Sequence, residues 1–344
     1  MKFLAAVLIK KKKIELLELQ VPILKYGHVL VKNLFSGICH TQKLEYEGKR
    51  GIDKFYPHCF GHESVAKVVE IGPGVKKVKI DDLVIVSWIK GNGIDASGPV
   101  YKTKDNKTIN SGPVSVFSEY SIVSENRIYI KPKILNIMDA VFFGCAVPTG
   151  MGSVKNISNL SIKKNLCILG CGGVGTFSLL AAYYSGFKDI LVIDNKPKKL
   201  NIAKNINVQT FLNKNKNLEI KKILKKNNNL LFSVVIESTG NIGVMQDAIN
   251  LVKNIDGRLV LNGNAEHGKQ IKINPLVFNQ GKTIVGSFGG SSNLDLDIDY
   301  YCKIFNKVPL KIRDTFSKIY KIQELETAFQ EIKNSNFVRG VIKF

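Results

Sequence analysis

The sequence predicts an α/β protein of two domains, in which a β-rich domain accompanies a doubly wound parallel sheet. Its 344 residues exceed the usual length of one domain, since most single domains contain about 100–200 residues. Short apolar or alternating segments separated by turns fill the first third of the chain, whereas strand-like and helix-like segments alternate from about residue 165. Such alternation is typical of a parallel α/β sheet.

The β-rich domain is predicted from five strand-like segments. Each is apolar or alternates apolar with polar residues, and turns such as Gly72-Pro73-Gly74 lie between them. The segments are residues 3–9, 28–36, 64–71, 83–88 and 117–123. This pattern favours a compact, barrel-like β-domain.

The parallel-sheet domain is predicted from the alternating strand-like and helix-like segments that begin at about residue 165. The expected strands are residues 165–169, 190–193, 232–237, 258–261 and 283–286, and the expected helices are residues 173–184 and 197–205. A helix near 325–333 and a strand at 339–344 are expected to return to the first domain. We therefore expect residues 1–146 and 287–344 to form the β-rich domain and residues 147–286 to form the parallel-sheet domain.

Composition indicates a globular chain with reduced cysteines. Hydrophobic residues make up 44% of the chain and aromatic residues 9%, which excludes a disordered protein. The six cysteines form no compact framework, as expected of reduced thiols in the cytoplasm. No apolar stretch approaches the roughly 20 residues of a membrane span, and lysines follow the first apolar segment instead of preceding it as in a secretory signal. We expect a cytoplasmic protein without a membrane partner.

The formal net charge of +22 raises the question of nucleic-acid binding. Lysine is spread along the whole chain together with abundant asparagine and isoleucine, which indicates a compositional bias and not a binding stripe. Only residues 213–229 concentrate lysines, and this segment lacks interleaved aromatic residues for base stacking. The pattern therefore favours a solvated surface over a nucleic-acid partner.

Three residues offer the ligands of a catalytic zinc site. Cys39, His62 and Cys145 supply thiolate and imidazole donors, and catalytic zinc takes three protein ligands while keeping a fourth position open. His58 and Cys59 shortly precede His62 and are expected to line the same cleft without binding metal.

A glycine run predicts a dinucleotide site beside the metal. Gly170, Gly172 and Gly175 follow a buried strand and open a helix, and Asp194 lies 19 residues after Gly175, close to the spacing of about 20 expected for dinucleotide binding. A carboxylate there accepts hydrogen bonds from the ribose hydroxyls of NAD, and at 4 Å it would repel the 2′-phosphate of NADP by roughly 4 kcal/mol. A Lewis acid next to a nicotinamide predicts hydride transfer with NAD.

Taken together, these fragments resemble a known family over essentially the whole chain. They are Cys39-His40-Thr41, Gly61-His62-Glu63, Gly144 to Gly150, Gly170 to Gly175 and Phe288-Gly289-Gly290. The chain resembles a zinc-containing alcohol dehydrogenase of the medium-chain dehydrogenase/reductase superfamily. The resemblance implies a GroES-like catalytic domain, a Rossmann domain inserted within it, and the interconversion of alcohols with aldehydes or ketones.

The resemblance also implies roles for individual residues. Thr41 matches the hydroxyl that hydrogen-bonds the alcohol oxygen, and Glu63 matches the acidic neighbour of the metal. Trp88 matches an aromatic wall of the substrate pocket. The remaining matches concern the cofactor: Thr149 and Val174 beside the nicotinamide, His40 and Arg339 on the pyrophosphate, and Gly173 with the other glycines of the turn. A homodimer or homotetramer is a further expectation from the family.

Two residues and one segment depart from the family pattern. Leu44 stands where many relatives carry a histidine that ends the proton relay, and leucine carries no proton. Gln42 stands where relatives often have aspartate, so the support of a zinc ligand must differ. Residues 89–116 contain no cysteine, although many relatives hold a structural zinc there. We expect one zinc per chain and a turn-rich segment near the cleft.

Two alternatives remain open from the sequence. A polyol or sugar dehydrogenase would use the same zinc and hydride chemistry on a different small-molecule substrate. A catalytically idle nucleotide-binding or nucleic-acid-binding module is the alternative from another class, and an absence of zinc in the purified protein would favour it.

Overall fold

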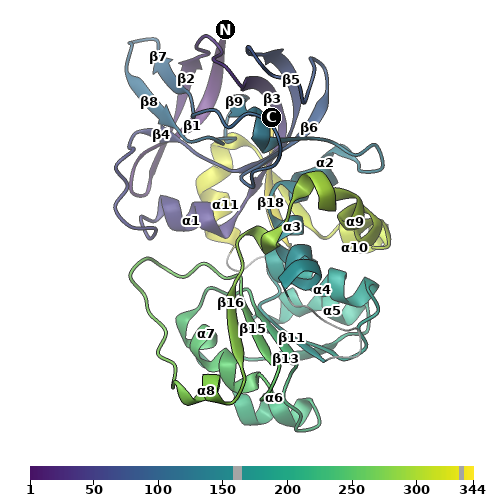
Figure 1. Ribbon diagram of the computed structural model, residues 1–344. Helices are drawn as coiled ribbons and strands as arrows, with labels where there is room; N and C mark the ends of the chain where they lie inside the picture. The colour runs from purple at the N-terminus through teal and green to yellow at the C-terminus, as the bar shows by residue number, and fades with distance from the viewer. Residues whose placement is uncertain (158–164, 333–336) are drawn as a thin grey trace.

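A computed structural model describes residues 1–157, 165–332 and 337–344. Figure 1 shows a β-rich half, which carries the N-terminus, above a half built on one parallel sheet. Three sheets form these halves, and the predicted fold class, with a barrel-like part and a doubly wound parallel part, is confirmed.

The first sheet is a small closed barrel. β1 and β2 form an antiparallel hairpin, and β7, β8 and β4 complete the circle back to β1. The strands are β1 (Lys2–Lys10), β2 (Lys13–Gln20), β7 (Val100–Thr103), β8 (Thr108–Ser111) and β4 (His58–Cys59). The pair β7 and β8 lies within the cysteine-free segment 89–116, which therefore continues the barrel.

The second sheet joins the two ends of the chain. Its order is β10, β6, β5, β3, β18 and β17, and β9 also pairs with β3. The strands are β10 (Ile128–Ile130), β6 (Leu83–Ser87), β5 (Glu63–Ile71), β3 (His28–Ile38), β18 (Arg339–Lys343), β17 (Ser317–Tyr320) and β9 (Tyr120–Ser124). Because β18 pairs with β3, the last strand returns to the β-rich half, as expected.

The third sheet is parallel throughout, in the order β13, β12, β11, β14, β15 and β16. The strands are β13 (Gln209–Leu212), β12 (Ile190–Asp194), β11 (Leu166–Leu169), β14 (Val234–Glu237), β15 (Arg258–Leu261) and β16 (Thr283–Gly286). The direction of the strand order reverses between β11 and β14. Such a reversal opens a ligand crevice at the carboxyl ends of the strands.

Helices flank this sheet on both sides in Figure 1. They are α4 (Gly173–Tyr184), α5 (Asn201–Asn205), α6 (Ile220–Lys226), α7 (Ile242–Ala248) and α8 (Leu276–Asn279), with 3₁₀ turns at η4 (Pro197–Leu200) and η5 (Ile249–Leu251). The expected helix at 173–184 is α4. The expected helix at 197–205 is split into η4 and α5.

A second group of helices lies in or beside the β-rich half and at the junction. They are α1 (His40–Tyr46), α2 (Ile137–Ala140), α3 (Ala146–Gly152), α9 (Leu294–Asn306), α10 (Leu310–Arg313) and α11 (Leu325–Glu331). Short turns accompany them at η1 (Glu125–Arg127), η2 (Val141–Gly144), η3 (Ser153–Ile157), η6 (Gly289–Ser291) and η7 (Ile322–Glu324). The helix expected near 325–333 is α11, and its expected last residue lies outside the described residues.

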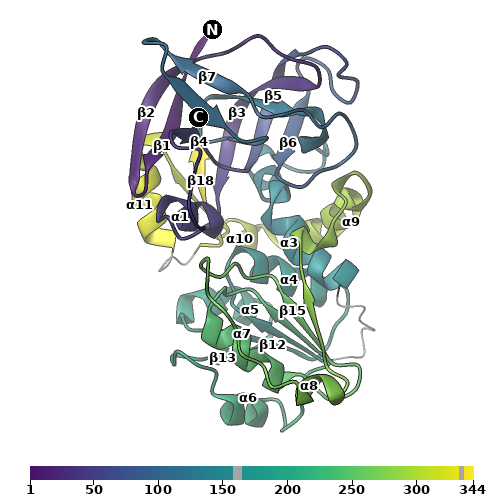
Figure 2. The same ribbon diagram turned by 60° about the vertical axis from the view of Figure 1, so that its left-hand side comes forward.

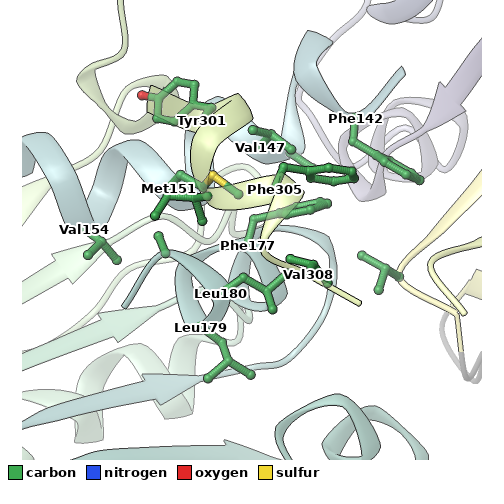
Figure 3. Close-up of a cluster of buried hydrophobic side chains, with 14 of the residues drawn as sticks. Phe142, Val147, Met151, Val154, Phe177, Leu179, Leu180, Tyr301, Phe305 and Val308 are labelled. Atoms are coloured by element: carbon green, nitrogen blue, oxygen red, sulfur yellow. The ribbon is translucent and has the colours of Figure 1, made fainter. Parts of the chain in front are cut away.

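One hydrophobic core joins the two halves. Figure 2 shows α3 and α9 between the β-rich half and the parallel sheet, and Figure 3 shows the side chains that meet there. The ring of Phe177 on α4 lies 5.8 Å from that of Phe142 and 6.2 Å from that of Phe305 on α9. This shared core fixes the parallel sheet against the β-rich half and so sets the position of the site between them.

Within the described residues, no single helix has the length and apolar character needed to cross a membrane. In the same part of the chain, one pair of helices, Ile137–Gly144 and Ala146–Ile157, bent by 59°, meets that test when its members are counted together.

Candidate active site

Three separate elements bring the predicted zinc ligands together. Cys39 caps the start of α1, His62 directly precedes β5, and Cys145 lies between η2 and α3. Their donor atoms all lie within 4.8 Å of one another, and Nε2 of His62 is 3.3 Å from Sγ of Cys145. Residues more than a hundred positions apart in the sequence thus converge on one point.

The pKa values of the two cysteines are shifted in opposite directions in this arrangement. A hydrogen bond from Cys145, followed by the charges of Arg339 and His62, holds the pKa of Cys39 well below its usual value. The pKa of Cys145 is raised because Cys145 donates that hydrogen bond and because it is buried. Thiolate and imidazole donors that exchange protons for a cation are the donor set preferred by zinc, so these residues fit the metal.

The side-chain amide of Gln42 contacts two of these ligands, Cys39 and His62. Its Oε1 accepts a hydrogen bond from the Cys39 amide at 2.9 Å, and its Nε2 contacts Nδ1 of His62. In this orientation Nδ1 of His62 is the acceptor, which places the ring proton on Nε2. Binding of a cation at Nε2 therefore requires that proton to leave or to move to Nδ1.

A buried ion pair lies beside the metal ligands. Nε of Arg339, at the start of β18, is 3.0 Å from Oε1 of Glu63, at the start of β5. Burial raises the pKa of Glu63 to about 7, although the Arg339 charge opposes the shift. Burial alone would lower the pKa of Arg339, but the negative charges of Glu63 and the two cysteines raise it.

The glycine turn connects β11 to α4 at the reversal point of the parallel sheet. Gly170 has φ +88°, and a Cβ on Gly175 would lie 1.8 Å from the Gly170 carbonyl oxygen. Gly172 faces open space, since a Cβ there would meet no atom of the described residues within 4 Å. A Cβ on Gly173 would lie 3.2 Å from Cζ of Arg339. Arg339 therefore lies between the metal ligands and this turn.

Asp194 lies at the end of β12, next to the turn. Its Oδ2 accepts a hydrogen bond from the Cys171 amide at 2.8 Å, and its Oδ1 accepts one from the Lys196 amide at 2.9 Å. Each carboxylate oxygen keeps a further lone pair for a ligand. Of the other predicted cofactor contacts, His40 is exposed at the first position of α1.

A cleft of about 820 Å³ opens onto the metal ligands. Its walls include the predicted residues Cys39, Thr41, His62, Trp88, Cys145, Thr149 and Val174, together with His58 and Cys59. The Trp88 ring lies edge-on to Phe288, with centroids 5.0 Å apart, and so forms an aromatic wall. Glu63, Asp194 and Arg339 are close to the site but are not on the wall of this cleft.

Sequence reasoning missed a set of polar residues in the cleft. Nδ2 of Asn264, from the loop after β15, donates to Oγ1 of Thr41 at 3.2 Å. Nδ2 of Asn262 and Oγ1 of Thr149 are buried without a hydrogen-bond partner among the described residues. Asn262 and Asn264 follow a predicted strand of the parallel sheet, and that position was the available signal.

The same loop crosses the cleft to the β-rich half. Nζ of Lys49 is 2.8 Å from Oε1 of Glu266, and the His267 amide donates to the Lys49 carbonyl at 2.9 Å. The cleft is thus bounded by both halves of the molecule.

Comparison with known families shows to which family this chain belongs. The model of the alcohol dehydrogenase GroES-like domain matches residues 25–133, and that of the zinc-binding dehydrogenase matches residues 173–301. The two matches together cover more than half of the chain. The chain belongs to the zinc-containing alcohol dehydrogenases of the medium-chain dehydrogenase/reductase superfamily. It is an oxidoreductase of that type.

Relatives of this zinc-containing alcohol dehydrogenase match along its length. S-(hydroxymethyl)glutathione dehydrogenase from Escherichia coli (strain SMS-3-5 / SECEC) is 26% identical over 359 residues, covering 97% of each chain. The enzyme of the same description from Synechocystis sp. is 24% identical over the same length and coverage.

Solved structures share the fold. Benzyl alcohol dehydrogenase from Acinetobacter calcoaceticus superposes with a TM-score of 0.87 at 23% identity, over 100% of this chain and 99% of that chain. 2R,3R-butanediol dehydrogenase from Bacillus subtilis superposes with a TM-score of 0.77 at 21% identity, over 99% of both chains.

Proposed function

We propose that this protein transfers a hydride between a small alcohol and NAD, with one zinc held by Cys39, His62 and Cys145. The convergence of these three donors on the wall of a cleft carries the proposal. The glycine turn that could receive the cofactor's pyrophosphate lies on the far side of Arg339. A bound zinc would supply the Lewis acidity that favours loss of the alcohol proton at neutral pH, and NAD would accept the hydride.

Thr41 is the residue proposed to hold the alcohol oxygen. Its hydroxyl oxygen lies 3.7 Å from the Cys39 sulfur, so it is next to the metal ligands. It already accepts a hydrogen bond from Asn264, which leaves its own proton free to be donated to the substrate oxygen or passed on.

Several cleft residues are proposed to orient the cofactor. Thr149 and Val174 line the cleft, and the unpartnered Oγ1 of Thr149 and Nδ2 of Asn262 offer hydrogen bonds to a polar ring substituent. The open face over Gly172, the α4 N-terminus and Arg339 suit a pyrophosphate. Asp194 and His40 complete the proposed NAD contacts, with Asp194 selecting NAD over NADP.

Trp88 and Phe288 are proposed to exclude water from the substrate. Their edge-on contact covers one side of the cleft near His62, whose ring centroid is 6.4 Å from that of Trp88. An apolar wall beside the reacting carbon favours hydride transfer over solvent exchange.

A polyol or sugar dehydrogenase is the second candidate, favoured by the polar residues of the cleft. Glu45, Asp53 and His58 line it on the side of the β-rich half, and carboxylates accept hydrogen bonds from additional hydroxyl groups. The named relatives include enzymes of S-(hydroxymethyl)glutathione, benzyl alcohol and butanediol. A panel of unbranched alcohols, aromatic alcohols and polyols therefore separates the candidates.

The proposal also covers the zinc content, the domain boundaries and the oligomeric state of the protein. One zinc per chain is supported by strands β7 and β8 occupying the segment where relatives hold a second zinc. Division into residues 1–146 with 287–344 and residues 147–286 is supported by the pairing of β18 with β3. A homodimer or homotetramer in the cytoplasm is proposed by analogy with the family.

The test combines turnover with metal analysis. Purified protein should contain one zinc per chain and reduce NAD in the presence of an alcohol, with a lower KM for NAD than for NADP. Cys39→Ser and His62→Ala should lose zinc and activity together, whereas Cys302→Ser, outside the cleft, should keep both. A zinc-free wild-type protein that binds nucleotide without turnover would instead indicate an idle binding module.

A further inference from the structure

The structure leaves the alcohol proton without an obvious acceptor. Leu44 is 4% exposed and carries no ionisable group, so it cannot receive a proton from Thr41. Hydride transfer to NAD nevertheless releases one proton for each alcohol oxidised. A different residue must therefore take that proton, or it must reach water directly.

Helix α1 places a carboxylate one turn from Thr41. Thr41 and Glu45 are separated by four positions on α1, and both line the cleft, whereas Leu44 is buried and does not line it. Side chains at positions i and i+4 of a helix lie next to each other, with Cβ atoms about 5–6 Å apart. The Glu45 carboxylate is therefore within reach of the Thr41 hydroxyl, directly or through one water molecule.

The Glu45 carboxylate is free to accept a proton. Its side chain is 21% exposed, and Nη1 of Arg50 lies 3.9 Å from its Oε2. Among the described residues, no group donates a hydrogen bond to it. An acceptor without fixed donors, in a cleft wall, is suited to transient protonation.

A second proton-holding pair lies beside Glu45. The ligand atoms of Glu45, Asp53 and His58 are all within 4.8 Å of one another. Nε2 of His58 lies 2.8 Å from Oδ2 of Asp53, and Nδ1 lies 3.0 Å from the Cys59 carbonyl oxygen. Both ring nitrogens face acceptors, so this pair can hold a proton between imidazole and carboxylate.

The pair leads toward the outside of the cleft. The side chains of Arg50 and Ile52, which also line it, are 56% and 90% exposed. A row of groups thus extends from Thr41 through Glu45 to His58 and Asp53 and ends near bulk water.

We propose that Glu45 accepts the proton that leaves through Thr41 during alcohol oxidation, in place of the residue that Leu44 cannot provide. The inference rests on the proposed function. The substrate C–H bond breaks with its electron pair passing to the nicotinamide, so NAD⁺ becomes NADH and the alcohol carbon becomes a carbonyl. The hydroxyl proton passes to Oγ1 of Thr41 while the Thr41 proton passes to Glu45. The resulting carboxylic acid releases its proton to water through His58 and Asp53, and aldehyde reduction reverses these transfers.

The electrostatics of the cleft support this role. Burial raises the pKa of Glu45 above its usual value, opposed by the positive charges of His58, Arg50 and His62 and reinforced by the negative charge of Asp53. A carboxyl group whose pKa lies closer to neutrality is the better proton acceptor at working pH.

The experiment compares three variants of the full-length, zinc-loaded protein. Glu45→Gln removes the acceptor at nearly constant shape, and Glu45→Asp keeps a carboxylate. Glu47→Gln makes the same charge change at the residue that follows α1, where the side chain pairs with Lys43 and Lys49 and does not line the cleft. Two readouts are used. The first is the pH dependence of kcat and of KM for alcohol oxidation, and the second is a set of difference infrared spectra of the protein alone during a pH titration.

Glu45→Gln should lower kcat by about 10²-fold at neutral pH, the usual contribution of a positioned proton acceptor. KM should change little, the acid limb of the profile should shift, and added imidazole should restore part of kcat. Glu45→Asp should keep an intermediate rate, and Glu47→Gln should match wild type. Carboxyls with a raised pKa, such as Glu63 and Glu237, titrate in all these proteins, but the wild type and Glu47→Gln spectra should contain one further titrating carboxyl component that is missing from Glu45→Gln.

Four results would overturn the inference. An unchanged pH profile in Glu45→Gln would show that the proton leaves elsewhere, and an increase in KM alone would make Glu45 a substrate-binding residue. Identical carboxyl titrations in wild type and Glu45→Gln would show that the Glu45 carboxyl does not contribute to the titration. A zinc-loaded wild type that oxidises no alcohol would remove the proposed function itself, a failure distinguishable because it appears before any variant is compared.

Discussion

Arg339 and Glu63 form an ion pair in the protein interior, with side chains only 5% and 0% exposed. The pair joins β18 to β5 and separates the metal ligands from the glycine turn. The two proposed ligand sites therefore share one buried pair of charges.

Breaking this pair from one side should strongly destabilise the protein. Arg339→Met removes the charge that favours ionised Glu63, so the carboxyl must stay ionised without a partner or take up a proton. Loss of one partner of a buried pair usually costs about 3–5 kcal/mol. The double variant Arg339→Met/Glu63→Gln should recover part of this loss in free energy of unfolding, measured by urea titration. Glu18→Gln, in the exposed pair with Lys2, serves as control and should cost less than about 1 kcal/mol. Equal losses in the single and double Arg339 variants would contradict this expectation.

The glycine turn offers a matched pair of substitutions. Gly175→Ala should prevent the turn from closing, since its Cβ would lie 1.8 Å from the Gly170 carbonyl oxygen. Gly172→Ala meets no atom within 4 Å, so its melting temperature should stay near wild type while its Kd for NAD rises, because the methyl group occupies the face proposed for the pyrophosphate. Thermal unfolding and NAD titration measure the two effects. Unchanged NAD affinity in Gly172→Ala would move the pyrophosphate away from this face.

Gln42 should control zinc affinity without binding the metal. Gln42→Leu removes the contacts to Cys39 and His62, and loss of such supporting hydrogen bonds typically weakens metal binding by about 10–100-fold. Gln42→Asp offers an anionic acceptor to Nδ1 of His62 and should bind zinc at least as tightly as wild type. Competition with a chromophoric chelator measures both. Wild-type affinity in Gln42→Leu would mean that the amide plays no supporting role.

Glu237 should make stability depend on pH. It is buried at the end of β14, and burial raises its pKa from 4.5 to about 7, against hydrogen bonds from Thr239 and Gly240. The Glu237 carboxyl ionises at lower pH in the unfolded chain than in the folded protein. The free energy of unfolding is therefore highest below about pH 4.5 and falls by up to roughly 3 kcal/mol as pH rises toward 7.

Glu237→Gln keeps the acceptor oxygen and removes this ionisation. The free energy of unfolding of the variant should therefore fall less than that of wild type between pH 5 and pH 8, as measured by urea titration at each pH. Parallel curves for the two proteins would show that Glu237 does not titrate in this range.

The parallel sheet was the most predictable part of the fold. Strand β11 is a buried apolar run, β15 has a buried apolar centre, and such segments appear directly in the sequence. Helix α9 was not predicted because its sequence, Leu-Asp-Leu-Asp-Ile-Asp, alternates with the period of a strand. Its packing against α3 and α4 overrides that local pattern.

The metal ligands were predictable for a different reason than the cleft around them. Cys39, His62 and Cys145 lie in short motifs that can be recognised from residue type alone. The contact of Asn264 with Thr41, and the grouping of Glu45 with His58, depend on how loops from different elements meet. No spacing in the sequence encodes such a meeting, so these residues required the structure.

The pairing of β3 with β18 has a consequence for the order of folding. Ile38 pairs with Gly340 across some 300 residues, whereas Leu166 pairs with Ile190 close by in the sequence. Contacts between distant segments form slowly because a long loop must first close. During refolding we therefore expect the parallel sheet to acquire protection from hydrogen exchange before the β3–β18 pairing does. Cys39 and His62 would spend that interval in an unfinished sheet, when their thiol and imidazole are most open to oxidation or to capture of the wrong metal.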